Sequence, residues 1–200
     1  MTLPIVPPDA LPPLATSGDY SQLVPGDPPA DVDALLAQAS AAVRSYCGWH
    51  IAPKIQQTWE LDGLGVIALR VPTLELVDLV SVSNEGTVLD PLTVQWSHDG
   101  YLRRISSGCG YSDGYWTADY RGVIVEAVHG FDLAAVGDLT ALIVSMTARA
   151  AASPTGETQQ TVGGVTVKMG SVNGSSVGSV GAMAPDELAA LAAYRLFGVA

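Results

Sequence analysis

The chain has 200 residues, 48% of them apolar, which is enough for one ordinary domain with a packed core or for a core with a small insert. Only 14% of the residues are charged, against roughly 25% in an average globular domain. Two explanations stay open: neighbouring subunits cover much of the surface, or the sequence is simply rich in small residues. Acidic residues outnumber basic ones 20 to 9, giving a net charge of −11, which argues against a surface that grips DNA.

The start of the chain shows no pattern of a targeting segment. Met1 is followed by neither a basic region nor an apolar stretch, and no unbroken run of about 18 apolar residues occurs. We therefore expect no signal peptide, no membrane contact and assembly in a cytoplasm. The two cysteines, Cys47 and Cys109, form no CxxC pattern, so neither a zinc site nor a disulfide framework is predicted.

Residues 1–30 are predicted to be an extended, Pro-rich arm. Prolines disfavour a continuous helix or a central strand here; they are Pro4, Pro7, Pro8, Pro12, Pro13, Pro25, Pro28 and Pro29. An extended segment with apolar side chains suits docking on a neighbouring subunit. The candidate contacts are Leu3, Ile5, Val6, Leu11 and Leu14. The alternative is that the arm packs on its own domain.

The first predicted helix begins after the arm. Asp27 is a suitable cap with Pro28 at the first helical position, and Gly48 is a suitable end. Apolar residues recur between them at helical spacing; they are Val32, Leu35, Leu36, Ala39, Val43, Tyr46 and Cys47.

From residue 55 to 129 the apolar period changes to two. Short strands are predicted over 58–61, 66–71, 79–83, 92–96, 101–105 and 123–128, with turns at 62–63, 84–86, 99–100 and 113–114 between them. Residues 55–129 are therefore predicted to form an antiparallel β subdomain inserted between the first two helices.

The rest of the chain returns to helical spacing. A second helix is predicted from Asp138 to Ser153–Pro154, and residues 161–169 are typical of a strand or a hairpin. A last helix is predicted over 185–197, although its cap residue, Ala184, is a poor one, so this helix is expected to need a partner for stability. The predicted fold is α+β: a helical core of three main helices (31–54 and 130–200, with a long loop at 155–183) and the β insert.

The patterns that resemble catalytic motifs lack the required context. Residues 174–178 (GSSVG) match G-x-S-x-G, but Gly-Ser-Val-Gly follows in place of a helix, and no histidine occurs after His129. The Gly-rich loop also lacks the Gly-Lys-Ser/Thr end of a phosphate-binding loop. We predict that the chain is not an enzyme and holds no cofactor.

The histidines and the aromatic residues are the remaining candidates for a binding site. His50, His98 and His129 lack metal-ligand spacing, and His129 is predicted to serve packing or hydrogen bonding. Tyr111, Asp113, Tyr115 and Trp116 could bind a sugar by stacking, although an exposed turn or a subunit contact is the commoner explanation. Trp49, Trp59, Trp96 and Trp116 are too dispersed among too few basic residues to form a base-stacking platform.

The order of these segments resembles a known family. The segments are residues 43–53 (VRSYCGWHIAP), 69–77 (LRVPTLELV), 125–131 (VEAVHGF), a helix ending at Ser153–Pro154, and a terminal Glu187–Leu188 and Tyr194–Arg195. Together they are similar to the head-to-tail adaptor (head-completion or connector) proteins of long-tailed phages, most of all to the actinobacteriophage type. The resemblance covers roughly residues 27–197. This sequence lacks the prolines that the family pattern would place near Gly137 and at Ala193, and this departure leaves the helix boundaries open.

The resemblance implies a structural role in a virion neck. Members form a homo-oligomeric ring, usually of twelve subunits, beneath the portal protein, and the other face of the ring meets the next neck connector, stopper or tail protein. Here the resemblance implies portal contacts by Leu188, Leu191, Tyr194, Arg195 and Leu196, and double-stranded DNA that passes an acidic lumen without specific binding. The alternatives are another neck or tail-terminator ring protein and, from a different class, a carbohydrate-binding or hydrolytic phage accessory protein.

Overall fold

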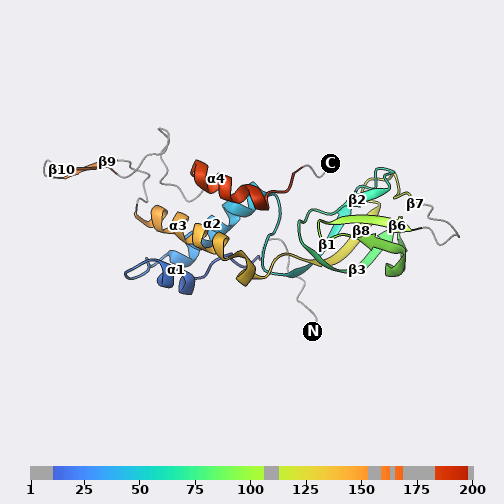
Figure 1. Ribbon diagram of the computed structural model, residues 1–200, viewed down its shortest axis with the longest axis horizontal. Helices are drawn as coiled ribbons and strands as arrows, with labels where there is room; N and C mark the ends of the chain where they lie inside the picture. The colour runs from blue at the N-terminus through green and yellow to red at the C-terminus, as the bar shows by residue number, and fades with distance from the viewer. Residues whose placement is uncertain (1–10, 106–112, 153–158, 163–164, 169–182, 198–200) are drawn as a thin grey trace. The chain divides into compact units, whose positions relative to one another are not determined.

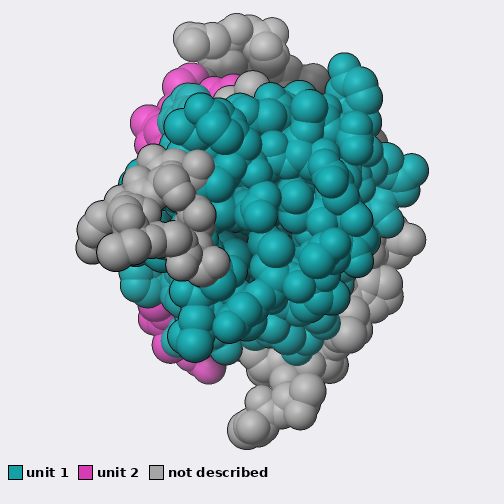
Figure 2. All heavy atoms as spheres, turned by 90° about the vertical axis from the view of Figure 1, so that its right-hand side faces the viewer, with its two compact units in different colours: residues 1–11, 48–132, 196–200 teal, residues 12–47, 133–195 magenta. Residues whose placement is uncertain are grey.

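The computed structural model describes residues 11–105, 113–152, 159–162, 165–168 and 183–197. The chain divides into two compact units, coloured separately in Figure 2. The helical unit comprises Pro12–Cys47 and Leu133–Arg195, and the described residues of the β unit are Leu11, Gly48–Asp132, Leu196 and Phe197, apart from the gap at 106–112. Helices and antiparallel sheets thus occur together, and the predicted α+β class is confirmed (Figure 1).

The helical unit is built on two helices of equal length, α2 (Val32–Cys47) and α3 (Gly137–Ala152). Each helix carries an apolar stripe, and five of the seven positions predicted for the first helix are buried in α2. α2 buries Val32, Leu36, Ala39, Ser40, Val43 and Cys47, and α3 buries Leu139, Ile143, Val144, Met146, Thr147 and Ala150. Burial at a spacing of three and four residues is what packs one helix against another. α2 ends where Gly48 adopts φ +80°, as predicted.

Part of the predicted arm is a helix, so the extended interpretation of residues 1–30 is wrong over this part. α1 (Ser17–Leu23) is preceded by Thr16, whose side chain accepts from the backbone N of Asp19, while the Asp19 carboxylate accepts from the backbone N of Thr16. This capping box satisfies two amide groups at the start of a short helix. The prolines end at Pro13 and resume at Pro25, leaving just enough chain between them for α1.

Two other helix boundaries differ from prediction. α2 begins at Val32 and not at Pro28, because Val32 N donates to Pro29 O (3.1 Å) in a turn before the helix. A 3-10 turn, η3 (Leu133–Val136), precedes α3. α4 (Pro185–Leu191) is shorter than the predicted 185–197, since the chain tightens into η4 (Ala192–Tyr194) and becomes extended at Arg195.

The segment after α3 contains the predicted hairpin, with β9 (Gln159–Val162) pairing antiparallel with β10 (Val165–Lys168). The predicted stop at residues 153–154 and the Gly/Ser-rich residues 170–181 lie outside the described residues.

The β unit contains two four-stranded antiparallel arrangements. The first has the order β1 (Ile55–Leu61), β8 (Val123–His129), β3 (Leu76–Asn84) and β4 (Thr87–Val88). The second has the order β2 (Ala68–Arg70), β6 (Tyr101–Ile105) and β5 (Val94–Trp96), with β7 (Asp113–Gly114) pairing β6. The predicted strand at 92–96 begins as a 3-10 turn, η2 (Pro91–Thr93), capped by the Asp90 side chain. Residues 113–114 form a strand where a turn was predicted.

Both sheets contribute to one apolar core. It contains Trp59, Leu69, Val71, Leu76, Leu79, Val82, Val94, Leu102, Trp116, Val123, Val125 and Ala127. The alternation along β8 shows the cause: Val123, Val125 and Ala127 are fully buried, whereas Ile124 is 41% exposed. The polar Nε1–H of Trp116 donates to Leu102 O, so its burial leaves no unsatisfied donor.

The two ends of the β unit are tied together. Phe131 N donates to Ile51 O (2.7 Å), and Gly130 N donates to Glu75 O (2.8 Å). Gly130 has φ +102°, and a Cβ there would lie 2.8 Å from Pro53 O, so only glycine fits this close approach. The motif around residues 43–53 therefore includes the entry of the chain into the β unit, and that around 125–131 includes its exit.

Among the described residues, one helical run, Leu133–Ala152, is long and apolar enough to cross a membrane by length and composition. Asp138 and Arg149 interrupt it, so it is not the unbroken apolar run considered in the sequence. Core helices pass the same test, and Leu139, Ile143 and Met146 of this run are buried inside the helical unit.

Candidate interaction site

The terminal segment predicted to dock on a portal divides into exposed and buried residues. Leu191 is fully buried in the helical unit, which corrects its assignment as a docking residue: it has no surface to offer a partner. Leu188, Tyr194 and Leu196 are half-buried, and Arg195 is exposed. The other exposed positions of α4 and η4 are Pro185 and Asp186 in the first turn and four alanines after it, Ala189, Ala190, Ala192 and Ala193. The face available for a partner is thus flatter than the sequence suggested.

A partly buried ion pair holds α4 on α3. Arg149 Nη1 lies 2.7 Å from Glu187 Oε1, and Arg149 Nη2 lies 3.0 Å from Glu187 Oε2, a two-pronged contact. The Glu187 side chain is only 9% exposed and also accepts from Ala184 N at 2.6 Å. Glu187 therefore supplies the cap that Ala184 cannot, and the helix that the sequence marks as weakly capped is stabilised from its third residue.

The segment after α4 is attached at two further points. The Tyr194 hydroxyl lies 2.8 and 2.9 Å from the two carboxylate oxygens of Asp138, in the first turn of α3. Burial and this carboxylate raise the pKa of Tyr194 to about 12, so the hydroxyl stays protonated and donates. The Arg195 guanidinium lies 5.2 Å from the centre of the Tyr46 ring.

Next to Tyr46 the surface is hollowed. A shallow depression of about 520 Å³ is lined by Ala42, Ser45 and Tyr46 of α2, by Leu188 of α4 and by Met183. Beneath it, burial raises the pKa of the Cys47 thiol to about 11, so this cysteine is a core residue and not a nucleophile.

The apolar arm residues are described in part. Leu3, Ile5 and Val6 lie outside the described residues, and Leu11 is half-buried. Leu14 is 1% exposed within its own helical unit, so its assignment as a contact to a neighbouring subunit is corrected, and for this residue the alternative of packing on its own domain holds. Leu14 N donates to Ser40 Oγ (2.9 Å), and Arg44 Nη2 donates to Pro12 O (2.7 Å), which attaches the segment to α2.

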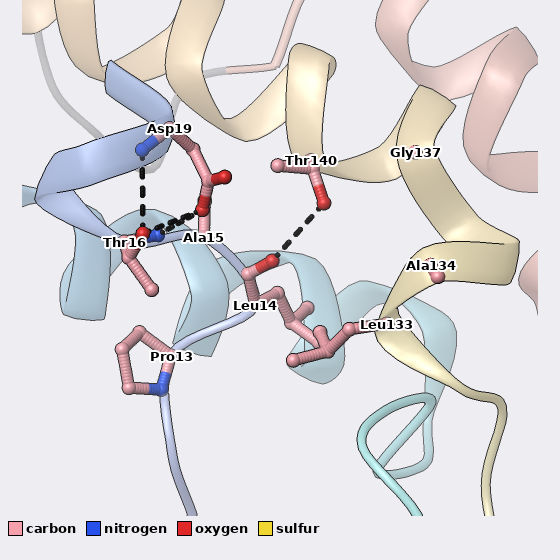
Figure 3. Close-up of a pocket in the computed structure, with 9 residues that line it drawn as sticks. All are labelled: Pro13, Leu14, Ala15, Thr16, Asp19, Leu133, Ala134, Gly137 and Thr140. Atoms are coloured by element: carbon pink, nitrogen blue, oxygen red, sulfur yellow. Dashed lines mark hydrogen bonds between the residues drawn. The ribbon is translucent and has the colours of Figure 1, made fainter. Parts of the chain in front are cut away.

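A second depression, of about 380 Å³, adjoins Leu14 (Figure 3). It is lined by Pro13, Leu14, Ala15, Thr16, Asp19, Leu133, Ala134, Gly137 and Thr140. The Asp19 carboxylate is already engaged with Thr16, and Thr140 Oγ1 donates to Leu14 O at 3.3 Å (Figure 3). The polar groups of this depression therefore hold its own walls together and do not converge on a ligand.

The aromatic cluster considered for sugar binding is not a stacking platform. Trp116 is 1% exposed and belongs to the β core, so its ring face is unavailable, which corrects that candidate role. Tyr115 is exposed, and Tyr111 lies outside the described residues.

The histidines form a buried pair and an exposed single residue. His129 Nε2 donates to Gln57 Oε1 at 2.9 Å, and its ring packs edge-on against Trp59 (4.6 Å between ring centres) and His50 (5.5 Å). Burial, with a smaller contribution from His50, lowers the pKa of His129 to about 3. His129 is thus the packing and hydrogen-bonding residue that the sequence predicted.

In the part of the chain that the structure describes, no group of three or more His, Cys, Asp or Glu side chains is arranged to hold a metal ion. The G-x-S-x-G match at residues 174–178 lies outside that part.

Sequence reasoning did not identify the partners that fix the terminal segment, Asp138, Arg149 and Glu187 of the helical unit. Asp138 was recognised only as a helix cap. A signal for Glu187 exists, because a glutamate three residues after a helix start is typical of a capping box, but Ala184 at the cap position obscured it.

No protein-family model matches the chain, and no curated protein matches it. Among solved structures, a chain in the virion of a native gene transfer agent particle is similar, with 16% identity and a TM-score of 0.53. This match covers 100% of the present chain and 98% of the other. A chain in the neck of an empty gene transfer agent particle, solved with C6 symmetry, gives a TM-score of 0.47 at 14% identity over 72% and 82% of the two chains. The fold similarity rests on the first of these, since a score below 0.5 does not establish a common fold.

Proposed function

We propose that this chain is a structural, non-enzymatic subunit of a phage-like virion neck: a head-to-tail adaptor that forms a ring beneath the portal and joins capsid to tail. The observation that carries the proposal is the similarity of fold to a chain of a gene transfer agent virion over essentially the full length of both chains. Because both units lie within the match, the likeness is not that of one small motif shared by many folds.

The charge of the chain supports a position beside DNA without binding to it. With 20 acidic and 9 basic residues, a ring of these subunits presents mostly negative charge, which repels phosphates and lets DNA slide through the lumen.

The exposed side of α4 and η4 is the proposed contact to the portal. Its small side chains, Ala189 and Ala190 among them, allow close approach of a partner helix, while Arg195 adds a positive charge at one end. Leu191 and Glu187 hold the segment in place from beneath and do not touch the partner.

The ring and its place are tested together. The purified chain should give closed rings of about twelve copies by native mass spectrometry and electron microscopy, the symmetric closure expected of such assemblies. A tagged chain should be found by immunogold labelling at the junction of capsid and tail. Label on the capsid shell or on the tail tip would contradict the proposal, and label further down the neck would favour another neck ring or a tail terminator.

The portal contact is tested by Ala189→Glu combined with Ala190→Glu. Both positions are exposed, so the fold should be retained by circular dichroism while co-sedimentation with portal rings is lost. Asp78→Lys, a change at an exposed position of the β unit, is the control and should co-sediment like the wild type. Deletion of residues 185–200 is a poorer test, because it also removes the buried Leu191.

A further inference from the structure

The β unit carries a rigid, exposed surface that the functions above leave unused. It lies at the end of the first sheet where β1 and β3 end and β8 begins, and is formed by the segments that follow β1, follow β3 and precede β8. We call this surface the acidic tip and define it as Glu60, Asp62, Leu64, Glu85, Asp119 and Tyr120. Tyr120 is 80% exposed and Leu64 is 49% exposed, so the acidic tip also presents apolar and aromatic surface. Figure 2 views the β unit from the side where β6 and β7 lie in Figure 1.

The backbone of the acidic tip is fixed by hydrogen bonds. Gly63 N donates to Asp119 O (3.1 Å), Gly65 N to Thr117 O (2.9 Å), and Glu85 N to Gly122 O (2.8 Å). A Cβ on Gly63 would lie 2.0 Å from Thr117 O, so the two turns are in closest contact there.

Three residues that are not glycine adopt left-handed backbone angles around the acidic tip. They are Leu64 (φ 53°), Glu85 (φ 52°) and Arg121 (φ 55°). Such angles are unfavourable for residues with a side chain and persist where the surrounding structure holds them. The acidic tip is therefore a preformed surface that would lose little conformational freedom on binding.

The charge of this surface indicates what kind of partner it fits. Four carboxylates, those of Glu60, Asp62, Glu85 and Asp119, stand against one guanidinium, that of Arg121, which is already paired with Glu60. A partner surface must therefore bring positive charge together with apolar or aromatic groups.

The same β unit presents such a surface on its second sheet; we call it the arginine face and define it as Ala68, Arg70, Gln95, Tyr101 and Arg103. Ala68 and Gln95 both pair with Arg103, and Arg70 pairs with Tyr101, so these side chains share one side of the sheet. Leu69 and Leu102, on the other side, are buried in the core. Arg103 is exposed, whereas Arg70 is half-buried and its Nη1 donates to Phe197 O (2.8 Å). The Arg70 guanidinium lies 5.2 Å from the centre of the half-exposed Tyr101 ring, so Arg103 is the arginine that this face presents most openly.

We propose that the acidic tip of one copy binds the arginine face of the next copy, so that the ring is built from a repeated head-to-tail contact. The inference rests on the proposed ring. Its support is charge complementarity: the chain has only 9 basic residues at a net charge of −11, so two copies repel each other unless an interface sets arginines against carboxylates. Two different surfaces of one chain that bind each other generate a ring when the rotation closes.

Two variants separate the halves of this contact. The tip variant carries Asp119→Lys and Tyr120→Ser, both at exposed positions, and the face variant carries Arg103→Glu. Each alone should be monomeric by native mass spectrometry and analytical ultracentrifugation. Mixed in equal amounts they should form a 1:1 dimer and nothing larger, because each supplies the intact surface that the other lacks.

Controls distinguish this result from misfolding and from failure of the ring itself. Asp78→Lys reverses a charge at an exposed position of β3 outside both surfaces, so it should still form rings. If the tip variant loses its circular dichroism signal, Tyr120→Ser alone takes its place. If the face variant does so, Arg103→Gln takes its place. Rings that persist in both variants, or a mixture that stays monomeric, would overturn the head-to-tail contact and leave the adaptor proposal standing. A wild-type chain that remains monomeric would overturn the ring and with it this inference.

Discussion

His129 shows how a single residue links burial to the acid stability of the β unit. Its pKa of about 3 lies below the usual value of 6.5 because the ring is buried between Trp59 and His50. A base whose pKa is lower in the folded state takes up a proton more readily when unfolded, so its contribution to stability is complete above about pH 6.5 and decreases as the pH falls toward 3.

We therefore expect the free energy of unfolding to fall below pH 6.5 with an added slope of at most about 1.4 kcal/mol per pH unit from this residue. His129→Phe keeps an aromatic ring against Trp59 and removes the titration. Urea denaturation at a series of pH values from 8 to 4 should give a shallower acid slope for the variant than for the wild type. Equal slopes would show that His129 takes no part.

Gly63 lies so close to Thr117 that replacing it with alanine should destabilise the β unit. Gly63→Ala would place a Cβ 2.0 Å from Thr117 O, and the clash should cost about 1–3 kcal/mol of unfolding free energy. Gly86→Asn is the control, because nothing lies within 4 Å of a Cβ there and asparagine tolerates the left-handed angle. Urea denaturation followed by tryptophan fluorescence measures both, and a loss no greater for Gly63→Ala than for the control would contradict the close contact.

At the scale of elements, α4 depends on one carboxylate. Glu187 accepts from Ala184 N and from both terminal nitrogens of Arg149, so Glu187→Ala should remove the acceptor of a cap amide and the two-pronged carboxylate contact of a half-buried guanidinium. A loss of about 1–3 kcal/mol is expected. Hydrogen exchange of the α4 amides should accelerate in Glu187→Ala more than in Glu187→Gln, which keeps an acceptor for Ala184 N. Unchanged exchange in Glu187→Ala would show that α4 is held by Leu191 alone.

The elements also show where sequence patterns sufficed. The apolar stripes of α2 and α3 and the alternation in β8 were predictable, because burial of one helix face or one sheet face imposes a fixed period. α1 was missed since a cluster of prolines indicated an extended chain, although Thr16 and Asp19 carry a capping signal between them. The end of α4 was placed too late, because a 3-10 turn continues the same apolar spacing for one more turn.

At the scale of the whole molecule, the β unit has its own core and hydrogen-bonded ends. We expect a fragment of residues 48–132 to fold alone, since Phe131 N binds Ile51 O and Ile55 pairs with His129 next to its termini. A dispersed amide spectrum by NMR would confirm this expectation. A fragment with the spectrum of an unfolded chain would show that the core of the β unit needs the rest of the molecule.

The net charge of −11 leads to a second prediction at this scale. The purified chain should not retain double-stranded DNA in a filter-binding assay at physiological salt, because few cations are available to displace counterions from the phosphates. Arg103→Glu should behave the same way. Micromolar binding by the wild type, lost on raising the salt, would argue against an acidic channel that DNA passes without binding.

The sequence by itself determined the α+β class and the position of the β segment between two helices, because these follow from local periods and turn residues along the chain. It also marked His129 as a packing residue and α4 as a poorly capped helix. Only the tertiary structure decided which apolar residues remain at the surface. The sequence predicted Leu14 and Leu191 as contacts to other subunits and offered Trp116 as a sugar-binding residue, but all three are buried. The reason is physical, since burial depends on neighbours that are distant in sequence. Leu14 N donates to Ser40 Oγ, 26 residues away, and Trp116 Nε1 donates to Leu102 O, 14 residues away.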